Sequence, residues 1–320
     1  MTYSFDPELA PAVPFLPEVD LADVEGTRRA LRSLVSAMPA PDLTGVATTD
    51  VRAIGPGGAD VAVRIYRPEG TDPEPAGLLY IHGGGFVSGD IEIESGGPVM
   101  LVQELGIVVA SVDYRLAPEH PYPAGLDDCM AALAWLHGEA RDLGIDPARI
   151  GVSGQSAGGG LAAAVALRAR DEGGLPLCFQ FLGIPELDDR LQTASMRRFV
   201  DTPMWNRPNA ELSWKHYLAS LAGDVPYYAA PARAVDLGGL PTAYVSAMEF
   251  DPLRDEAIDY AARMLQAGVT VELHVYPGTF HGASAIPGTA FARLLQAETI
   301  AALRRGLGLG SPRPPESLDS

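Results

Sequence analysis

Strand-like and helix-like patterns alternate along most of this 320-residue chain. Short apolar runs typical of buried strands are separated by segments with apolar residues at helical spacing. Repeated strand-helix-strand units bury their apolar faces as a mostly parallel sheet with helices on both sides. We therefore predict an α/β fold with a doubly wound sheet. The strand patterns lie at 49–54, 61–67, 78–81, 107–114, 149–153, 177–184, 242–248 and 271–276, and the helical patterns at 95–105, 124–143, 157–170, 253–267 and 289–305.

Three segments depart from this alternation. Residues 1–45 begin with an acidic, proline-rich stretch, residues 187–232 contain several prolines but no clear strand, and residues 308–320 have little apolar pattern. We predict that the first two form a cap on the main α/β domain, which spans 46–307 and contains the second as an insertion. The last segment is predicted to be a disordered tail.

The acidic composition limits the possible partners. A net charge of −18 disfavours a nucleic-acid surface, which needs clustered basic residues, and disfavours docking on anionic lipid. The N-terminus lacks the basic start and apolar run of a signal peptide, and no apolar stretch is long enough to span a bilayer. We expect a cytoplasmic protein without a nucleic-acid or membrane partner.

The two cysteines suggest neither a disulfide framework nor a metal site. Cys129 lies in a helical apolar run and Cys178 in a strand-like one. Neither has the spacing of metal ligands, so both are predicted to be buried, reduced core residues, and no metal is expected.

A candidate nucleophile lies where the strand pattern at 149–153 meets the helical pattern that follows it. The segment Gly154-Gln155-Ser156-Ala157-Gly158 matches G-x-S-x-G. In this context the motif forms a sharp turn that holds the serine in a strained conformation, and its glycines leave room for neighbouring backbone. The alternative is a glycine-rich helix start with a capping serine. The strand-turn-helix context favours Ser156 as a nucleophile.

A second motif, His82-Gly83-Gly84-Gly85, follows the strand pattern at 78–81 directly. Acyl transfer produces an oxyanion that needs preorganised N–H donors, and a glycine run lets bare backbone approach it. We expect Gly84, Gly85 and Ala157 to donate, with His82 fixing the glycine loop. A phosphate-binding loop is the alternative, but no G-K-[ST] follows.

A serine nucleophile needs a histidine base, and in this fold the base comes last in the chain. Three histidines follow Ser156. His281 lies just past the last strand pattern and is the favoured base. His274 lies inside that strand, where a satisfied structural role is expected, and His216 lies on an expected helix in the insertion.

The base in turn needs a carboxylate that orients it. Asp251 follows the strand pattern at 242–248 within three residues and is the favoured candidate. Asp255 is the runner-up, because it lies on the expected helix that follows, and Glu249 is a weaker candidate.

Together with further motifs, these residues resemble the hormone-sensitive-lipase-like esterases, the bacterial family IV branch of the α/β-hydrolases. The resemblance covers about residues 60–305. It rests on His82-Gly83-Gly84-Gly85-Phe86, on Asp113-Tyr114-Arg115-Leu116-Ala117-Pro118-Glu119 with His120-Pro121-Tyr122-Pro123-Ala124, on Gly154 to Gly159, on Asp251-Pro252-Leu253-Arg254-Asp255-Glu256, and on Phe280-His281-Gly282.

The resemblance implies an eight-stranded sheet with a cap, no cofactor, and hydrolysis of short- to medium-chain acyl esters of small molecules. It assigns the catalytic triad to Ser156, Asp251 and His281 and the oxyanion hole to Gly84, Gly85 and Ala157. The family often forms dimers, which makes a homodimer an expectation.

Two further residues concern details of the motifs. Family members commonly carry Asp or Thr before the nucleophile, whereas this chain has neutral Gln155. In the Asp-Tyr-Arg-Leu-Ala-Pro-Glu run, we expect Arg115 to pair with Glu119.

The motifs leave two alternatives open. The same triad could hydrolyse an acetylated sugar, lactone, carbamate or amide. A non-catalytic, ligand-binding receptor of the same fold is disfavoured, because the plant receptors that resemble this family have lost the histidine that His281 supplies here. Acyl-chain preference would depend on the cap, for which the candidate aromatic residues are Phe15, Trp205, Trp214 and Tyr217. For any one of them, packing in the core of the cap is the favoured role.

Overall fold

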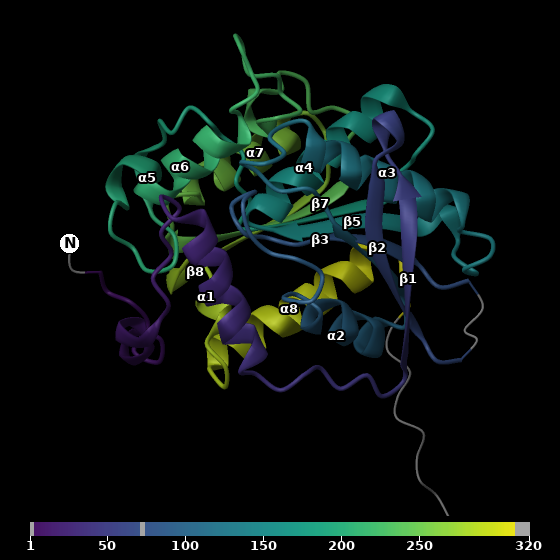
Figure 1. Cartoon of the computed structure of the whole chain (residues 1–320), viewed down its shortest axis with the longest axis horizontal. Coiled ribbons are helices and arrows are strands. Elements are labelled where there is room, and N and C mark those ends of the chain that lie inside the picture. The colour runs from purple at the N-terminus through teal and green to yellow at the C-terminus, as the bar shows by residue number, and fades with distance from the viewer. Residues whose placement is uncertain (1–2, 71–73, 311–320) are drawn as a thin grey trace, which may run out of the picture.

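The computed structural model describes residues 3–70 and 74–310, and its centre is an eight-stranded sheet (Figure 1). The strand order is β1-β2-β4-β3-β5-β6-β7-β8. The strands are β1 (Val46–Ile54), β2 (Asp60–Pro68), β3 (Gly77–Ile81), β4 (Val108–Asp113), β5 (Ile150–Gln155), β6 (Phe179–Gly183), β7 (Thr242–Phe250) and β8 (Val271–Phe280).

The pairing of these strands sets where the loops meet. β2 runs antiparallel to both β1 and β4, and every other neighbouring pair is parallel. Ile81 at the end of β3 pairs with Gly154, and Gln155 at the end of β5 pairs with Gly183. The loops after β3, β5 and β6 therefore leave the sheet side by side. The prediction of a mostly parallel, doubly wound eight-stranded sheet is confirmed.

Helices cover both faces of the sheet, with α2 and α8 on one face and α3, α4 and α7 on the other (Figure 1). β3 is buried on both sides, because Leu79 packs with the cluster around α3 and α4 while Leu78 packs with α2 and α8. The helices are α1 (Val24–Ser36), α2 (Gly96–Leu105), α3 (Ala124–Gly138), α4 (Ala157–Glu172), α5 (Ala194–Arg198), α6 (Arg207–Tyr217), α7 (Arg254–Gln266) and α8 (Ala290–Gly306).

The two predicted cap segments lie together near the ends of these strands. α1 comes from the N-terminal segment, and α5 and α6 come from the insertion (Figure 1). Asn209 on α6 joins the two segments, because its Oδ1 accepts from Leu21 N at 3.2 Å and its Nδ2 donates to Val19 O at 2.8 Å. We call residues 3–36, the part of the predicted segment 1–45 that ends with α1, and residues 187–232 the cap segments; the division of the chain into a cap and a catalytic domain stays a prediction.

The predicted pairing of Arg115 with Glu119 is wrong. Arg115 instead binds Asp128 on α3, with Nη2 at 2.7 Å from Oδ1 and Nε at 2.8 Å from Oδ2. The Arg115 backbone N–H donates to the same carboxylate at 2.9 Å. Because the Asp128 carboxylate is buried, it needs a cationic partner, and Arg115 supplies it. Glu119 instead accepts from Arg28 on α1.

Several smaller expectations can be compared with the fold. Cys129 is buried as predicted, whereas Cys178 is only half-buried, and both thiols are free. Most of the predicted disordered tail, from residue 311 onward, lies outside the described residues. Among the helices of 3–70 and 74–310, none is long and apolar enough to cross a bilayer. The cytoplasmic location and the homodimer stay predictions.

We predict that Asp128→Ala lowers the free energy of unfolding by about 3 kcal/mol, because it strands a guanidinium and a backbone N–H that share one buried carboxylate. Urea denaturation measures this change. Asp50→Ala removes the exposed partner of Arg64 and is the matched control, with an expected cost below about 1 kcal/mol. Equal costs for the two variants would contradict the structural role of Asp128.

Candidate active site

Ser156 lies at the sharp turn between β5 and α4, in a strained conformation. Its φ is 56° and its ψ is −124°, a region that side chains other than glycine rarely occupy. Backbone hydrogen bonds hold it there: Ser156 N donates to Gly183 O at 2.8 Å, and Ser156 O accepts from Gly160 N at 3.0 Å and Glu186 N at 3.1 Å. The turn is therefore fixed by β6 and the loop after it.

The glycines of the motif leave room for this turn. A Cβ at Gly158 would lie 2.3 Å from Ile81 O and 2.5 Å from His82 O, and a Cβ at Gly154 would lie 2.2 Å from Gly158 O. These distances are far below van der Waals contact, so no side chain fits at either position. The geometry agrees with the strained serine turn expected from the motif.

A line of hydrogen bonds runs from Asp251 through His281 to Ser156. His281 Nε2 lies 2.9 Å from Ser156 Oγ, and His281 Nδ1 lies 2.7 Å from Asp251 Oδ2. Asp251 follows β7 and His281 follows β8, so three strands contribute. Ser156 and His281 are each 8% exposed and Asp251 is 1% exposed. This arrangement lets the histidine accept the serine proton while the carboxylate orients its ring.

The other two candidate histidines point elsewhere. His274 Nε2 lies 2.9 Å from Glu272 Oε1 on the same strand, and its Nδ1 lies 3.5 Å from Glu298 on α8. His216 on α6 lies 3.2 Å from the carbonyl of Leu21. Neither contacts Ser156.

The other two candidate carboxylates are also occupied. Asp255 accepts from Ser195 N at 2.7 Å and pairs with Arg254. Glu249 accepts from Gly278 N at 2.7 Å. Asp251 is thus the candidate that reaches His281.

The glycine loop after β3, residues 82–89, is shaped so that two N–H groups face away from its internal hydrogen bonds. His82 Nδ1 donates to Gly83 O at 2.8 Å, and Ser88 donates to Gly84 O from both Oγ at 2.9 Å and N at 3.0 Å. These carbonyls belong to the peptides whose N–H groups are those of Gly84 and Gly85. In a trans peptide the N–H points opposite to the carbonyl.

Both N–H groups are available to a substrate oxygen. Across residues 3–70 and 74–310, no hydrogen bond uses the N–H of Gly84 or Gly85. Ala157 is the first residue of α4, so its N–H has no partner within the helix. His82 stays behind the loop, fully buried and stacked on Tyr114 with ring centroids 4.2 Å apart. We call residues 82–89 the oxyanion loop.

The chain matches the family model described as the alpha/beta hydrolase fold over residues 78–285. It belongs to the α/β-hydrolase family. A carboxylesterase named NlhH from Mycobacterium tuberculosis is 40% identical over 297 residues, covering 89% of this chain and 90% of the relative. An ethyl acetate hydrolase from Pseudomonas putida is 35% identical and covers 70% of this chain and 71% of its own length.

A solved structure described as a bacterial heroin esterase is also similar to this hydrolase. It superposes with a TM-score of 0.93 at 53% identity, covering 95% of this chain and 98% of that one. The family, the fold and the enzyme class predicted from the sequence are confirmed, and the hydrolase is an enzyme of the carboxylic ester hydrolase class.

Of the four aromatic residues considered for the acyl pocket, Trp205 lies against the hydrolase's candidate triad. Its ring centroid is 5.8 Å from that of His281, and a Cβ at Gly85 would lie 2.7 Å from its ring. Tyr217 and Trp214 pack against Phe86 instead and belong to the core. Phe15 is 87% exposed and contributes nothing to the site.

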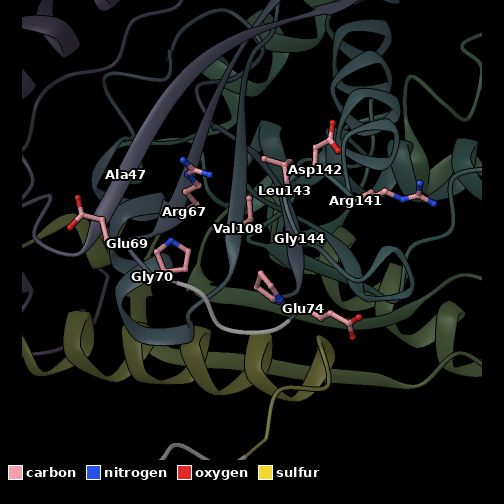
Figure 2. Close-up of a pocket in the computed structure, with 12 residues that line it drawn as sticks. Ala47, Arg67, Glu69, Gly70, Glu74, Val108, Arg141, Asp142, Leu143 and Gly144 are labelled. Carbon is pink, nitrogen blue, oxygen red and sulfur yellow. The ribbon is translucent and has the colours of Figure 1, made fainter.

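A separate cavity of about 670 Å³ lies at the opposite end of the central strands from Ser156 (Figure 2). Its lining includes Val108, which begins β4, together with Arg67, Arg141 and Asp142. Because Ser156 follows the C-terminal end of β5 and this cavity borders the N-terminal ends of the strands, the cavity plays no part in the candidate active site.

Glu186 is a polar group of the site that no sequence motif indicated. It is fully buried in the loop after β6, and neither carboxyl oxygen has a hydrogen-bond partner among the residues the structure describes. Burial raises the pKa of Glu186 to about 8, and the negative charge of Asp251 adds to this shift. Burial also raises the pKa of Glu256, whose Oε1 accepts from the backbone N–H groups that follow Glu186. Glu186 thus keeps its proton to a higher pH than an exposed glutamate does.

We predict that Glu186→Gln becomes more stable than the wild type as the pH rises. Between the ordinary glutamate value of 4.5 and the folded value of about 8, the folded chain keeps a proton that the unfolded chain has lost. The wild type therefore loses about 1.4 kcal/mol per pH unit in this window, and neutral glutamine does not. Urea denaturation of both proteins from pH 5 to pH 8 measures the difference. A difference that stays constant across the window would contradict a raised pKa at Glu186.

Proposed function

We propose that this hydrolase is a serine carboxylesterase that cleaves short- to medium-chain acyl esters of small molecules through an acyl-enzyme on Ser156. The main support is that Asp251, His281 and Ser156 are joined by hydrogen bonds, and that the glycine loop passes beside Ser156, where a Cβ at Gly83 would lie 3.7 Å from Ser156 Cβ. In this loop the N–H groups of Gly84 and Gly85 make no hydrogen bond to any residue that the structure describes. A nucleophile, a base and oxyanion donors are the groups that acyl transfer requires.

The acylation step begins when Ser156 Oγ attacks the ester carbonyl and His281 Nε2 accepts its proton. Asp251 stabilises the resulting imidazolium and holds the ring in place. The carbonyl oxygen becomes an oxyanion that accepts from the N–H groups of Gly84, Gly85 and Ala157. The tetrahedral intermediate then collapses, and His281 donates its proton to the leaving alcohol. The acyl group remains on Ser156.

Deacylation repeats these steps with water. His281, neutral again, takes a proton from water as the water oxygen attacks the acyl carbonyl. The same N–H groups bind the second oxyanion, the carboxylic acid leaves, and Ser156 regains its proton from His281. The cycle uses no group beyond this chain and water.

The surroundings of the triad support a small acyl group. Ser156 and His281 are almost completely enclosed, and Trp205 closes over both His281 and Gly85. A related enzyme bears the name ethyl acetate hydrolase, which is a short acyl ester activity. Gln155 packs beside Gly183, and its neutral side chain is compatible with this chemistry.

We predict Ser156-dependent hydrolysis of p-nitrophenyl esters, with kcat/KM highest between acetate and the medium chains and falling toward palmitate. Ser156→Ala is expected to lower kcat by at least about 10⁴-fold, because the remaining groups cannot form the acyl-enzyme. Release of p-nitrophenol measures both. Wild-type turnover by Ser156→Ala would contradict the nucleophile, and a maximum at palmitate would contradict the proposed chain length. A folded wild type that cleaves only amides, carbamates or acetylated sugars would contradict the proposed substrate class and would mean that the same triad hydrolyses another acyl bond.

A further inference from the structure

The tip of the oxyanion loop has a strained backbone. Gly85 has a φ of 59°, and the next residue, Phe86, has a φ of 61°. A left-handed conformation is unfavourable at a bulky, non-glycine residue and persists only where neighbouring groups enforce it. Here these groups are the hydrogen-bond donors to the carbonyl oxygens of Gly85, Phe86 and Val87.

The first group is Ser213, on α6 of the cap segments. Its hydroxyl donates to Gly85 O at 3.0 Å, and both residues belong to a fully enclosed region. Ser213 is 0% exposed, so no water can replace this hydroxyl without rearrangement. The contact joins α6 to the peptide that follows the Gly85 N–H.

The second group is Arg28, on α1 of the other cap segment. Arg28 Nε donates to Val87 O at 2.7 Å, and its Nη2 donates to Ala117 O at 3.0 Å. The N–H of Ala117 in turn donates to Phe86 O at 2.9 Å. Glu119 holds the guanidinium through both carboxylate oxygens, and this pairing lowers the pKa of Glu119 to about 2. Arg28 thus supports two of the three carbonyls.

We propose that the cap segments hold the oxyanion loop in its working geometry, with Ser213 and Arg28 as positioning residues. The proposal rests on the proposed function of the loop as oxyanion hole. His82 and Ser88 fix the peptides of Gly83 and Gly84, while the strained tip depends on side chains from the cap segments. Docking of the cap therefore affects the chemical step and does not merely enclose the substrate.

The test uses p-nitrophenyl acetate, whose small acyl group minimises contact with the cap. Ser213→Ala and Arg28→Ala are each expected to lower kcat by about 10- to 100-fold with KM within about twofold, because a displaced oxyanion donor weakens binding of the transition state more than binding of the substrate. Affinity for a trifluoromethyl ketone inhibitor is expected to fall in parallel with kcat/KM. If the two side chains affected only thermal stability, kcat and the affinity for the inhibitor would stay unchanged.

Two controls match these variants. Ser220→Ala removes a hydroxyl that also joins the region after α6 to a backbone carbonyl, that of Tyr122, which lies outside the oxyanion loop. Arg29→Ala removes the exposed neighbour of Arg28. Both are expected to keep kcat within about twofold of the wild type.

The outcomes separate this inference from the proposed function. A wild type without Ser156-dependent turnover overturns the proposed function and the inference with it. An active wild type whose Ser213→Ala and Arg28→Ala variants keep kcat and inhibitor affinity overturns the inference alone, as does an equal loss in Ser220→Ala and Ser213→Ala. If Ser213→Ala fails to fold, Arg28→Ala with its Arg29→Ala control gives the same reading.

Discussion

The positive φ of Ser156 is the constraint on which the rest of the site depends. A serine with a φ of 56° needs backbone hydrogen bonds that hold it in this conformation. Its N–H donates to Gly183 O at the end of β6, and its carbonyl oxygen accepts from Glu186 N in the loop that follows. The same turn excludes a side chain at Gly158, because the end of β3 passes directly against it, and at Gly154, because the backbone of Gly158 occupies that space. The proposed nucleophile, the oxyanion loop and the loop after β6 are thus parts of one packed arrangement.

Parallel strand pairing gives this arrangement its chemistry. β7 and β8 end beside the serine turn and carry Asp251 and His281 to it, so residues 95 and 125 positions beyond Ser156 meet its hydroxyl within two hydrogen bonds. The cap segments complete the site from the opposite side, where Trp205 covers the base and Ser213 reaches the loop. Burial of both sides strengthens every electrostatic interaction between them.

Much of the fold could be predicted because central strands such as β3 and β4 are buried on both faces and appear as short, mainly apolar runs. The turns at the C-terminal ends of β3 and β5 could be predicted from the glycine motifs at 82–85 and 154–158. Ser213, Arg28 and Glu186 could not be predicted, since Ser213 and Gly85 are 128 positions apart and no periodic pattern links them. Helix α1 was missed because it buries only Val24, and its local signal was the capping Asp23, which accepts from Gly26 N. The prediction that Arg115 pairs with Glu119 was wrong because it used only their closeness in the sequence, which does not indicate that the carboxylate of Asp128 on α3 is buried beside Arg115.

The central claim is that His281 activates Ser156 as the nucleophile, and a fluorophosphonate probe with peptide mass spectrometry tests it most directly. We expect a single adduct on Ser156 in the wild type, and labelling slower by orders of magnitude in His281→Ala because the hydroxyl then lacks its base. An adduct on another residue, or labelling of Ser156 at the wild-type rate in His281→Ala, would contradict it.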